Sequence, residues 1–342
     1  MLEAMIKEIT DRSGYIHGSV ETIYFGGGTP SLLSEKDLKR LLDTVYKNFN
    51  VIDSVEITIE ANPDDIDPAS LQSWGVLGIN RISIGVQSFV PMDLEWMNRF
   101  HNAARAFSCI SQVKEAGFLN YSVDLIFGTP TLPDSSWKEN IQTLLSFEPP
   151  HIAAYALTVE PFTALDKMIR LNAKDSVDME KQARQFVFLM QSLDKKGYLQ
   201  YEISNFCLPG KKSRHNSSYW QGVPYLGIGP SAHSYNGNTR SWNISNNSQY
   251  IRGIQTDQPI FEIETLTDVQ RLNEYIMTGL RTTEGISLAY VETHFGQAYA
   301  NEIEKAAEQF CTLQQVVRTE NDLTLTTEGK LFADGIASSL FF

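Results

Sequence analysis

Short strand-like runs alternate with helical segments through the first half of this chain, from Val20 to about Thr158. The runs are rich in β-branched and aromatic residues, and the segments between them carry apolar residues at i, i+3 and i+4. This alternation is the pattern of βα units around a parallel sheet, so it predicts an α/β fold built as most of a barrel. The five expected strands are Val20–Phe25, Ser54–Glu60, Arg81–Gly85, Tyr121–Phe127 and His151–Leu157.

The chain begins on a helix rather than on a strand. Leu2, Met5, Ile6 and Ile9 share one face of a helix, and that apolar face needs a sheet beside it. In a fold that alternates strand and helix, a strand should precede this helix. We therefore expect that an opening strand and its following loop belong to the architecture but are absent from this sequence.

The pattern changes after the predicted strands. A helix near Asp178–Lys196 and a β-rich run at Tyr198–Phe206 precede a stretch dense in glycine, serine, asparagine and aromatic residues, which is typical of functional loops. Three helical patterns, a hairpin at Val316–Leu325 and a final helix from Thr327 then predict a small, mainly helical, winged-helix-like domain. The three patterns span about Leu266–Leu280, Leu288–His294 and Ala298–Cys311. The expected boundaries are 1–206 for the partial barrel, 207–258 for the loop-rich segment and 259–342 for the C-terminal domain.

The net charge limits the partners of the chain. Asp and Glu number 41 against 28 Lys and Arg, a net charge of -13, and no basic run gathers on a predicted helix face. Such a surface cannot neutralise phosphates, so we exclude nucleic acid and interpret the winged-helix-like domain as structural or partner-facing. No stretch approaches the roughly 18 apolar residues of a membrane span, and no signal peptide is apparent, so the predicted location is the cytoplasm.

Glycine and polar residues follow the predicted strands, at the edge where a parallel barrel carries its active site. The turn Gly26-Gly27-Gly28-Thr29-Pro30 lets backbone groups approach a ligand, and it lacks the lysine of a P-loop. A tight turn without a ligand is the alternative. Glu60 and Asp124 need a cation or hydrogen-bond donors, because an unpaired charge on a strand is costly. Arg99 either binds a carboxylate through its planar guanidinium or is a solvated helix residue.

Taken in order and spacing, four segments resemble the radical S-adenosylmethionine (SAM) proteins related to oxygen-independent coproporphyrinogen III oxidase. The segments are Gly26–Pro30, Glu60–Pro63, Arg81–Phe89 and Asp124–Gly128. The resemblance covers nearly the whole chain and implies a partial (β/α)6 radical-SAM-type barrel that lacks its first strand and cluster loop. It implies SAM contacts at Gly27, Gly28, Thr29, Glu60, Gln87, Arg99 and Asp124. SAM suits such residues, because it carries an ammonium group, a carboxylate and ribose hydroxyls.

Within that superfamily, two further segments resemble the HemW branch, the haem chaperones. The segments are Ser213–Trp220 and Tyr225–Ser234. The resemblance implies haem contacts at His215, Asn216 and Tyr219, with His215 ligating the haem iron, and Tyr219 and Trp220 offer flat apolar surface. It implies delivery of haem to haem-requiring respiratory proteins, with peripheral membrane association through such a partner. His233 is either a second ligand or a structural histidine.

One part of the resemblance fails. The family's Cys-x3-Cys-x2-Cys run, which ligates a [4Fe-4S] cluster, is absent, and Cys109, Cys207 and Cys311 lie about a hundred positions apart. They match neither a disulfide framework nor a metal motif, so we expect free thiols, with Cys109 in the core. The missing run falls in the segment that the N-terminal helix indicates, and we expect it upstream of Met1 in a longer form. As written, the chain is predicted to hold no cluster and to cleave no SAM.

The leading hypothesis is therefore a haem-binding and delivery protein with a SAM-binding barrel. An oxygen-independent coproporphyrinogen III oxidase, which carries out an oxidative decarboxylation, is the alternative, because the SAM-binding segments are shared between the branches. A remnant with neither activity is the third hypothesis. The segment from His215 to Tyr219 favours the chaperone.

Overall fold

The computed structural model describes the whole chain, residues 1–342, as two compact units that interleave along the sequence. The sheet unit comprises Tyr24–Leu32 and Ile57–Ser213. The terminal unit, which holds both ends of the chain, comprises Met1–Ile23, Leu33–Glu56 and Arg214–Phe342. The sequence-based boundaries at residues 206 and 258 differ from this division, and they stay a prediction.

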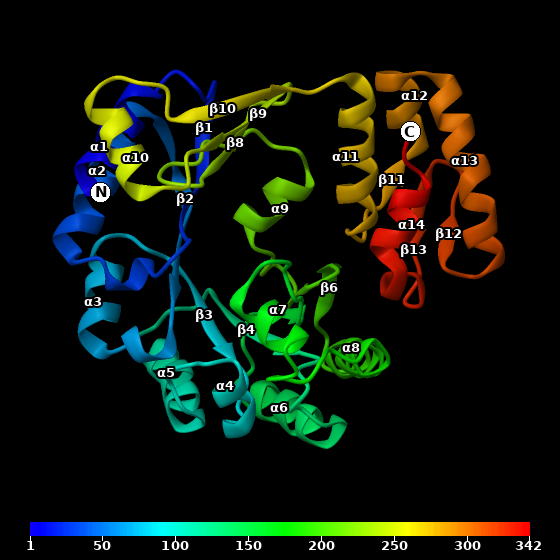
Figure 1. Cartoon of the computed structure of the whole chain (residues 1–342), viewed down its shortest axis with the longest axis horizontal. Helices are drawn as coiled ribbons and strands as arrows, with labels where there is room; N and C mark the ends of the chain where they lie inside the picture. The colour runs from blue at the N-terminus through cyan, green and yellow to red at the C-terminus, as the bar shows by residue number, and fades with distance from the viewer. The chain divides into compact units, whose positions relative to one another are not determined.

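A seven-stranded sheet has the order β1-β2-β3-β4-β5-β7-β6 (Figure 1). Its strands are β1 (Ser19–Phe25), β2 (Asn50–Ala61), β3 (Arg81–Gln87), β4 (Tyr121–Phe127), β5 (His151–Ala156), β6 (Leu199–Glu202) and β7 (Asn205–Cys207). Strands β2 to β5 pair in parallel, and their apolar residues, such as Ile82, Ile84, Val123 and Leu125, are fully buried. The five predicted strands and the partial α/β barrel are confirmed. The largest displacement is in β2, which begins at Asn50 rather than Ser54.

The β-rich run at Tyr198–Phe206 forms a hairpin. β6 and β7 pair antiparallel to each other, and β7 pairs antiparallel to β5. The buried side chain of Glu202 makes the turn, because its Oε2 accepts hydrogen bonds from Ser204 N at 3.0 Å and Asn205 Nδ2 at 2.6 Å. The run therefore reverses direction without glycine or proline at its turn.

Helices of the sheet unit connect the parallel strands, and Figure 1 shows α3, α5, α6 and α8 along one side of them. These elements are η1 (Pro30–Leu32), η2 (Pro63–Asp65), α3 (Pro68–Val76), α4 (Pro91–Trp96), α5 (Ala103–Glu115), α6 (Asp134–Ser146), α7 (Ala164–Arg170) and α8 (Met179–Asp194). The start of α3 shows how the sequence sets these ends: Asp67 accepts from Ser70 N at 2.8 Å, and Ser70 Oγ reaches back to Asp67 N. Trp137 and Leu144 of α6 are buried in the core.

The terminal unit contains α1 (Leu2–Asp11), α2 (Glu35–Asn48), α9 (Arg214–Trp220), β8 (His233–Tyr235), β9 (Thr239–Asn243), α10 (Asn247–Gln255) and β10 (Phe261–Thr265). The segment 207–258, which was predicted to be loop-rich, therefore also contains α9, β8, β9 and α10. Its asparagines have structural roles that composition hides. Asn246 caps α10 by accepting from Gln249 N at 3.0 Å, and the side chain of Asn243 is buried.

The C-terminal part of the terminal unit is a helical group with a small sheet. It contains α11 (Asp268–Leu280), β11 (Ile286–Ser287), α12 (Leu288–Phe295), α13 (Gln297–Thr312), β12 (Val316–Arg318), β13 (Asp322–Leu325), η3 (Gly329–Phe332) and α14 (Ala333–Ser339). The strand order is β11-β13-β12, and both pairs are antiparallel. The predicted hairpin at Val316–Leu325 is confirmed, as are the helices that surround it. No helix of the chain is long and apolar enough to span a bilayer.

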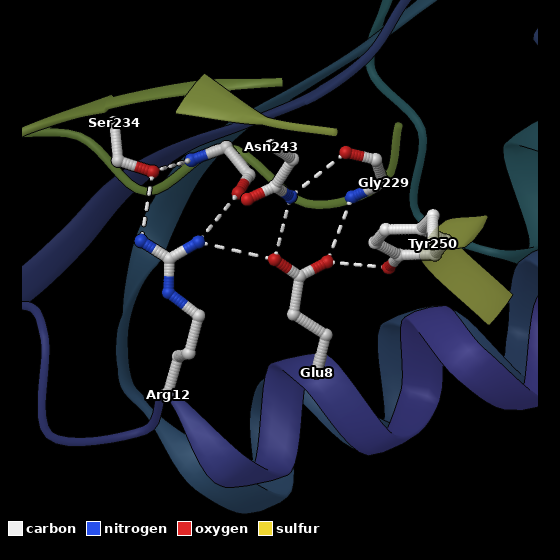
Figure 2. A network of polar contacts seen from close by, with 7 residues as sticks. Glu8, Arg12, Gly229, Ser234, Asn243 and Tyr250 are labelled. Carbon is white, nitrogen blue, oxygen red and sulfur yellow. Dashed lines mark hydrogen bonds and ion pairs between the residues drawn. The ribbon is translucent and has the colours of Figure 1, made fainter. Parts of the chain in front are cut away.

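A buried polar network joins α1 to α10 and to the segment that precedes α10 (Figure 2). Glu8 Oε1 accepts from Arg12 Nη1 at 3.0 Å and Asn243 Nδ2 at 2.7 Å, while Oε2 accepts from Gly229 N at 2.9 Å and Tyr250 OH at 2.5 Å. Each oxygen of this buried carboxylate therefore accepts two hydrogen bonds. The apolar side of α1 packs on α10 through Ala4, which joins a cluster with Tyr250. Polar and apolar contacts therefore hold the same face of the helix that opens the chain.

Candidate functional site

The residues predicted to contact SAM all lie in the sheet unit, in β2, β3 and β4 or in loops after strands and helices. Gly27, Gly28 and Thr29 follow β1, Glu60 lies near the end of β2, Gln87 ends β3, Arg99 follows α4, and Asp124 lies in β4. Charge interactions link Asp124 to both Glu60 and Arg99. The structure therefore brings two carboxylates and one guanidinium to the same edge of the sheet.

The glycine turn is tied directly to Glu60. Glu60 Oε2 accepts from Gly27 N at 3.2 Å, and Glu60 Oε1 accepts from the hydroxyl of Tyr24 at 2.7 Å. Gly27 and Gly28 have φ values of 72° and 65°, a region that favours glycine, and open space lies where a Cβ would be. Gly26 is needed for another reason, because its Cβ would lie 2.6 Å from the Tyr24 ring. The turn thus presents exposed backbone beside a fixed carboxylate.

Asp124 is held by two serine hydroxyls. Ser83 Oγ donates to Asp124 Oδ2 at 2.9 Å, and Ser122 Oγ donates to Asp124 Oδ1 at 2.8 Å. Burial raises the pKa of Asp124 to about 6, the serine hydrogen bonds act in the opposite direction, and the nearby Glu60 charge raises it further. Near neutral pH the group is an ionised carboxylate with acceptor capacity left for a cationic or hydroxyl-bearing ligand.

Arg99 and Gln87 meet above Gly85. Arg99 Nη2 donates to the Gly85 carbonyl at 3.2 Å, and a Cβ at Gly85 would lie 3.0 Å from Gln87 Nε2 and 3.2 Å from Arg99 Nη2. Gln87 adopts a φ of 68°, which is unusual for a residue with a side chain. The alternative of Arg99 as a solvated helix residue is wrong: it follows α4, and its Nε is buried without a partner. Burial lowers the pKa of this guanidinium.

These observations fit SAM better than they fit an empty structural turn. A buried guanidinium nitrogen without a partner matches a ligand carboxylate, and the two carboxylates match an ammonium group and ribose hydroxyls. Sequence reasoning missed Tyr24, Ser83 and Ser122, which hold Glu60 and Asp124. Their only sequence signal is the alternation of residues along β1, β3 and β4.

The cysteines do not fit an iron–sulfur cluster. Cys109 and Cys207 are buried, Cys311 is half-buried on α13, and all three are free thiols. Burial raises the pKa of each thiol, to about 12 for Cys109, whereas a cluster needs thiolates. No group of three or more His, Cys, Asp or Glu residues in the chain could hold a metal ion.

Anaerobic reconstitution of this chain with iron and sulfide should therefore leave no stable cluster. The expected absorption spectrum after desalting lacks the broad visible band of a [4Fe-4S] centre, because no three thiolates can converge on one site. Iron and sulfide assays on the desalted protein check this. Incorporation of about four irons per chain, with a spectral change on SAM addition, would contradict it.

His215 lies on the short helix α9 rather than in the predicted loop, and both of its ring nitrogens are engaged. Nδ1 is 2.8 Å from Thr22 Oγ1, and Nε2 is 3.0 Å from the hydroxyl of Tyr219. Burial lowers the pKa of His215 to about 4, so the imidazole is neutral at physiological pH. Asn216 follows on the same helix and is half-buried.

Glu56 of β2 anchors the start of α9. Its Oε1 accepts from His215 N at 3.0 Å, and its Oε2 accepts from Arg214 N at 3.2 Å. A carboxylate at this position satisfies two backbone donors at the helix N-terminus. Sequence reasoning missed both Glu56 and Thr22, because they lie more than a hundred residues before the motif and no local pattern links them to it.

Aromatic rings extend the His215 motif along the terminal unit. The His215 ring lies edge to face with Tyr219 at 5.0 Å between centroids, and Tyr219 lies edge to face with Tyr225 at 4.8 Å. Tyr219 is 42% exposed. His233 begins β8 with an exposed side chain, and its ring lies 6.3 Å from that of Trp242. The His215 motif therefore offers an exposed aromatic edge next to a neutral imidazole.

Comparison with known proteins places these features in a family. The Radical SAM superfamily matches residues 1–144, and the HemN C-terminal domain matches residues 266–332. The "Heme chaperone HemW" of Bacillus subtilis is 32% identical over 319 residues, covering 93% of this chain and 84% of that protein. The protein of the same name from Lactococcus lactis is 33% identical, with coverage of 86% and 76%. The structure of Escherichia coli coproporphyrinogen III oxidase (HemN) is similar in fold, with a TM-score of 0.83, 22% identity, and coverage of 99% and 82%.

Proposed function

The chain belongs to the HemW family of the radical SAM superfamily, and on this premise we propose that it binds haem and delivers it to acceptor proteins. The observation that carries the proposal is His215, a half-buried and neutral imidazole beside the exposed aromatic edge of Tyr219. Bacterial relatives such as those of Bacillus subtilis and Lactococcus lactis are named haem chaperones, whereas the likeness to coproporphyrinogen III oxidase at 22% identity concerns the fold alone.

The hydrogen bonds of His215 prepare its Nε2 to ligate iron. A neutral ring has one proton, and the Thr22 hydroxyl can accept it from Nδ1 at 2.8 Å. The lone pair of Nε2 then accepts from Tyr219 OH at 3.0 Å. Iron ligation needs such a deprotonated nitrogen, oriented by a hydrogen bond on the other side of the ring. Haem would take the place of the Tyr219 hydroxyl, while the Tyr219 ring and Asn216 would contact the macrocycle.

The test is haem titration of the His215→Ala chain. Loss of the iron ligand should weaken haem binding by at least about 100-fold, more than the loss of an outer partner of a metal ligand, and should change the position of the Soret band. His294→Ala is the matched control, since His294 also lies on a short helix with a tyrosine four residues away. An unchanged Soret band and affinity in the His215→Ala chain would remove the assignment.

Replacing Tyr219 by phenylalanine should strengthen haem binding. The change keeps the ring but removes the hydroxyl that occupies His215 Nε2, so haem no longer has to break a hydrogen bond worth about 1 kcal/mol. We expect haem affinity to rise by about fivefold in a Soret titration. Tyr225→Phe, in the adjacent ring, should leave the affinity unchanged. A weaker Tyr219→Phe complex would mean that the hydroxyl itself binds haem.

We also propose that the sheet unit holds SAM. Arg99 would bind the carboxylate of SAM, and Glu60 and Asp124 would bind its ammonium group and ribose hydroxyls. The remaining polar groups of SAM would contact the Gln87 side chain and the backbone of Gly27, Gly28 and Thr29. SAM brings a reactive sulfonium to such a site. The cysteines of this chain do not supply the cluster that its cleavage needs, so no cleavage by this chain is proposed.

The proposed partners are haem-requiring respiratory proteins, reached from the cytoplasm. The chain has a net charge of -13, which does not favour direct binding to anionic lipid. Association with a membrane would therefore pass through the acceptor protein. Co-purification of a haem-dependent respiratory protein with the haem-loaded chain, but not with the haem-free chain, is the expected result.

A further inference from the structure

A chain of buried hydrogen bonds leads from β6 to Asp124. Tyr201 OH lies 2.7 Å from His151 Nε2, His151 Nδ1 lies 2.9 Å from Ser122 Oγ, and Ser122 Oγ lies 2.8 Å from Asp124 Oδ1. Tyr201, His151 and Ser122 are all buried. The chain starts at the hairpin strand β6 and crosses β5 to β4, so it joins the far edge of the sheet to the candidate SAM site.

The donors and acceptors available fix the direction in which the hydrogen bonds from Tyr201 to Asp124 donate. Burial lowers the pKa of His151 well below its ordinary value, so the ring is neutral and carries one proton. The Tyr201 hydroxyl already accepts from Ser213 N at 3.4 Å, and its own proton has no acceptor other than His151 Nε2. His151 must then donate from Nδ1 to Ser122, and Ser122 donates to Asp124.

We propose that Tyr201 and His151 are positioning residues, which orient the Ser122 hydroxyl so that Asp124 is kept an ionised acceptor for the cofactor. This inference rests on the SAM site proposed above. Protonating Asp124 on Oδ1 would reverse the chain and leave the Tyr201 proton without an acceptor. Protonating it on Oδ2 would leave the Ser83 hydroxyl only its longer contact with Oδ1, at 3.3 Å instead of 2.9 Å. In the first case a buried hydroxyl loses its acceptor, which is costly, and in the second a short hydrogen bond is exchanged for a longer one.

Charged groups from several strands also interact with the residues of this hydrogen-bond chain. Glu60 of β2 and Tyr24 of β1 interact with Asp124, and so does Arg99 after α4. Arg81 of β3 acts on Asp124, His151 and Tyr201. Because these groups are fixed in position, a change confined to the Tyr201 hydroxyl isolates the contribution of the hydrogen-bond chain.

The surroundings of Tyr201 keep its hydroxyl protonated, so that it can donate a hydrogen bond. Burial raises the pKa of Tyr201 well above its ordinary value, against the opposing effect of Arg81. Lys212, whose Nζ lies 5.5 Å from the centre of the ring, and the neighbouring Cys207 and Glu202 complete its charged surroundings. Tyr201 therefore keeps its proton across the pH range in which Asp124 titrates.

The test is a titration of Asp124 in the cofactor-free chain. Carbon-13 NMR of aspartate carboxyls follows the group, and its signal is assigned by its absence in Asp124→Asn. The wild-type midpoint is expected near pH 6, and in Tyr201→Phe it should rise by about one pH unit, a tenfold change in the protonation equilibrium. Tyr198→Phe is the matched control, since this buried tyrosine donates to the Pro149 carbonyl at 2.7 Å and takes no part in the hydrogen-bond chain.

A second variant keeps the hydroxyl and the ring shape. Tyrosine carrying one ring fluorine at position 201 is a stronger donor, so the Asp124 midpoint should fall slightly below that of wild type. An unchanged or lower midpoint in Tyr201→Phe, or an unchanged midpoint in the fluorinated chain, would overturn the inference.

SAM titrations by calorimetry separate this inference from the function on which it rests. Wild-type affinity should fall as pH drops through about 6, and the Tyr201→Phe affinity should begin to fall about one pH unit higher, because the protonated acid no longer attracts the cationic ligand. If no variant binds SAM but the NMR midpoints move as expected, the hydrogen-bond chain stands and the cofactor assignment falls. If SAM binds and the midpoints do not move, the cofactor assignment stands and the hydrogen-bond chain has no effect on Asp124.

Discussion

Replacing Glu8 by glutamine should lower the free energy of unfolding of the terminal unit by about 3–5 kcal/mol. The Glu8 side chain is 1% exposed and accepts four hydrogen bonds, so an amide nitrogen in its place must face donors that can no longer be paired. The loss of charge also leaves the Arg12 guanidinium without its ion pair. Urea unfolding followed by circular dichroism measures the stability of the variant.

Hydrogen exchange locates the same effect. Glu8 holds Gly229 and Asn243, and Arg12 donates to Ser234 Oγ at 3.1 Å, so amides of α1, β8 and β9 should all exchange faster, by about 100-fold or more. Glu3→Gln is the control on the same helix, because Glu3 is 78% exposed and pairs only with Arg40 at 2.8 Å. Its effect should stay within about 0.5 kcal/mol. Equal losses in the two variants would mean that the Glu8 network contributes little.

The strands were predictable because parallel strands are buried on both faces. Residues such as Ile82, Ile84, Val123 and Leu125 form short apolar runs that allow few other interpretations. The hairpin of β6 and β7 was not predictable, since its turn depends on the buried side chain of Glu202 rather than on glycine or proline. A charged residue usually indicates a surface position, and nothing local shows that this one is buried.

The short helices and strands within 207–258 were not predicted, for a related reason. Asparagine and glycine are typical of loops, yet Asn243 is buried because Glu8 accepts its hydrogen bond from more than two hundred residues away. Gly27, Gly28, Thr29, Glu60 and Gln87 could be proposed because they lie near the end of a predicted strand or just after one, whereas Arg99 follows α4 and Asp124 lies within β4. The residues that orient these side chains and His215 could not be predicted. Thr22, Glu56 and Tyr201 contact their hydrogen-bond partners only in the folded chain.

Replacing Glu56 by alanine should impair the His215 motif more than any other change outside the motif. Glu56 is 5% exposed, and its two oxygens satisfy the backbone donors of Arg214 and His215. Without the carboxylate, two donors at a half-buried helix end lose their partners, so we expect a loss of about 2–4 kcal/mol in the free energy of unfolding. Because α9 presents His215 to haem, the haem affinity should also fall by about 10- to 100-fold.

A second pair of variants separates the anchoring of α9 from general destabilisation. Glu21→Gln removes the other carboxylate that contacts Arg214, at 3.1 Å, but Glu21 is 68% exposed, so its stability and haem affinity should stay near wild type. Glu56→Gln keeps one acceptor oxygen and should fall between wild type and Glu56→Ala in both measurements. Haem affinity is to be measured at a temperature where each variant remains folded by circular dichroism. A folded Glu56→Ala chain with wild-type haem affinity would show that His215 does not depend on this anchor, and the role proposed for α9 in presenting the imidazole would then be lost.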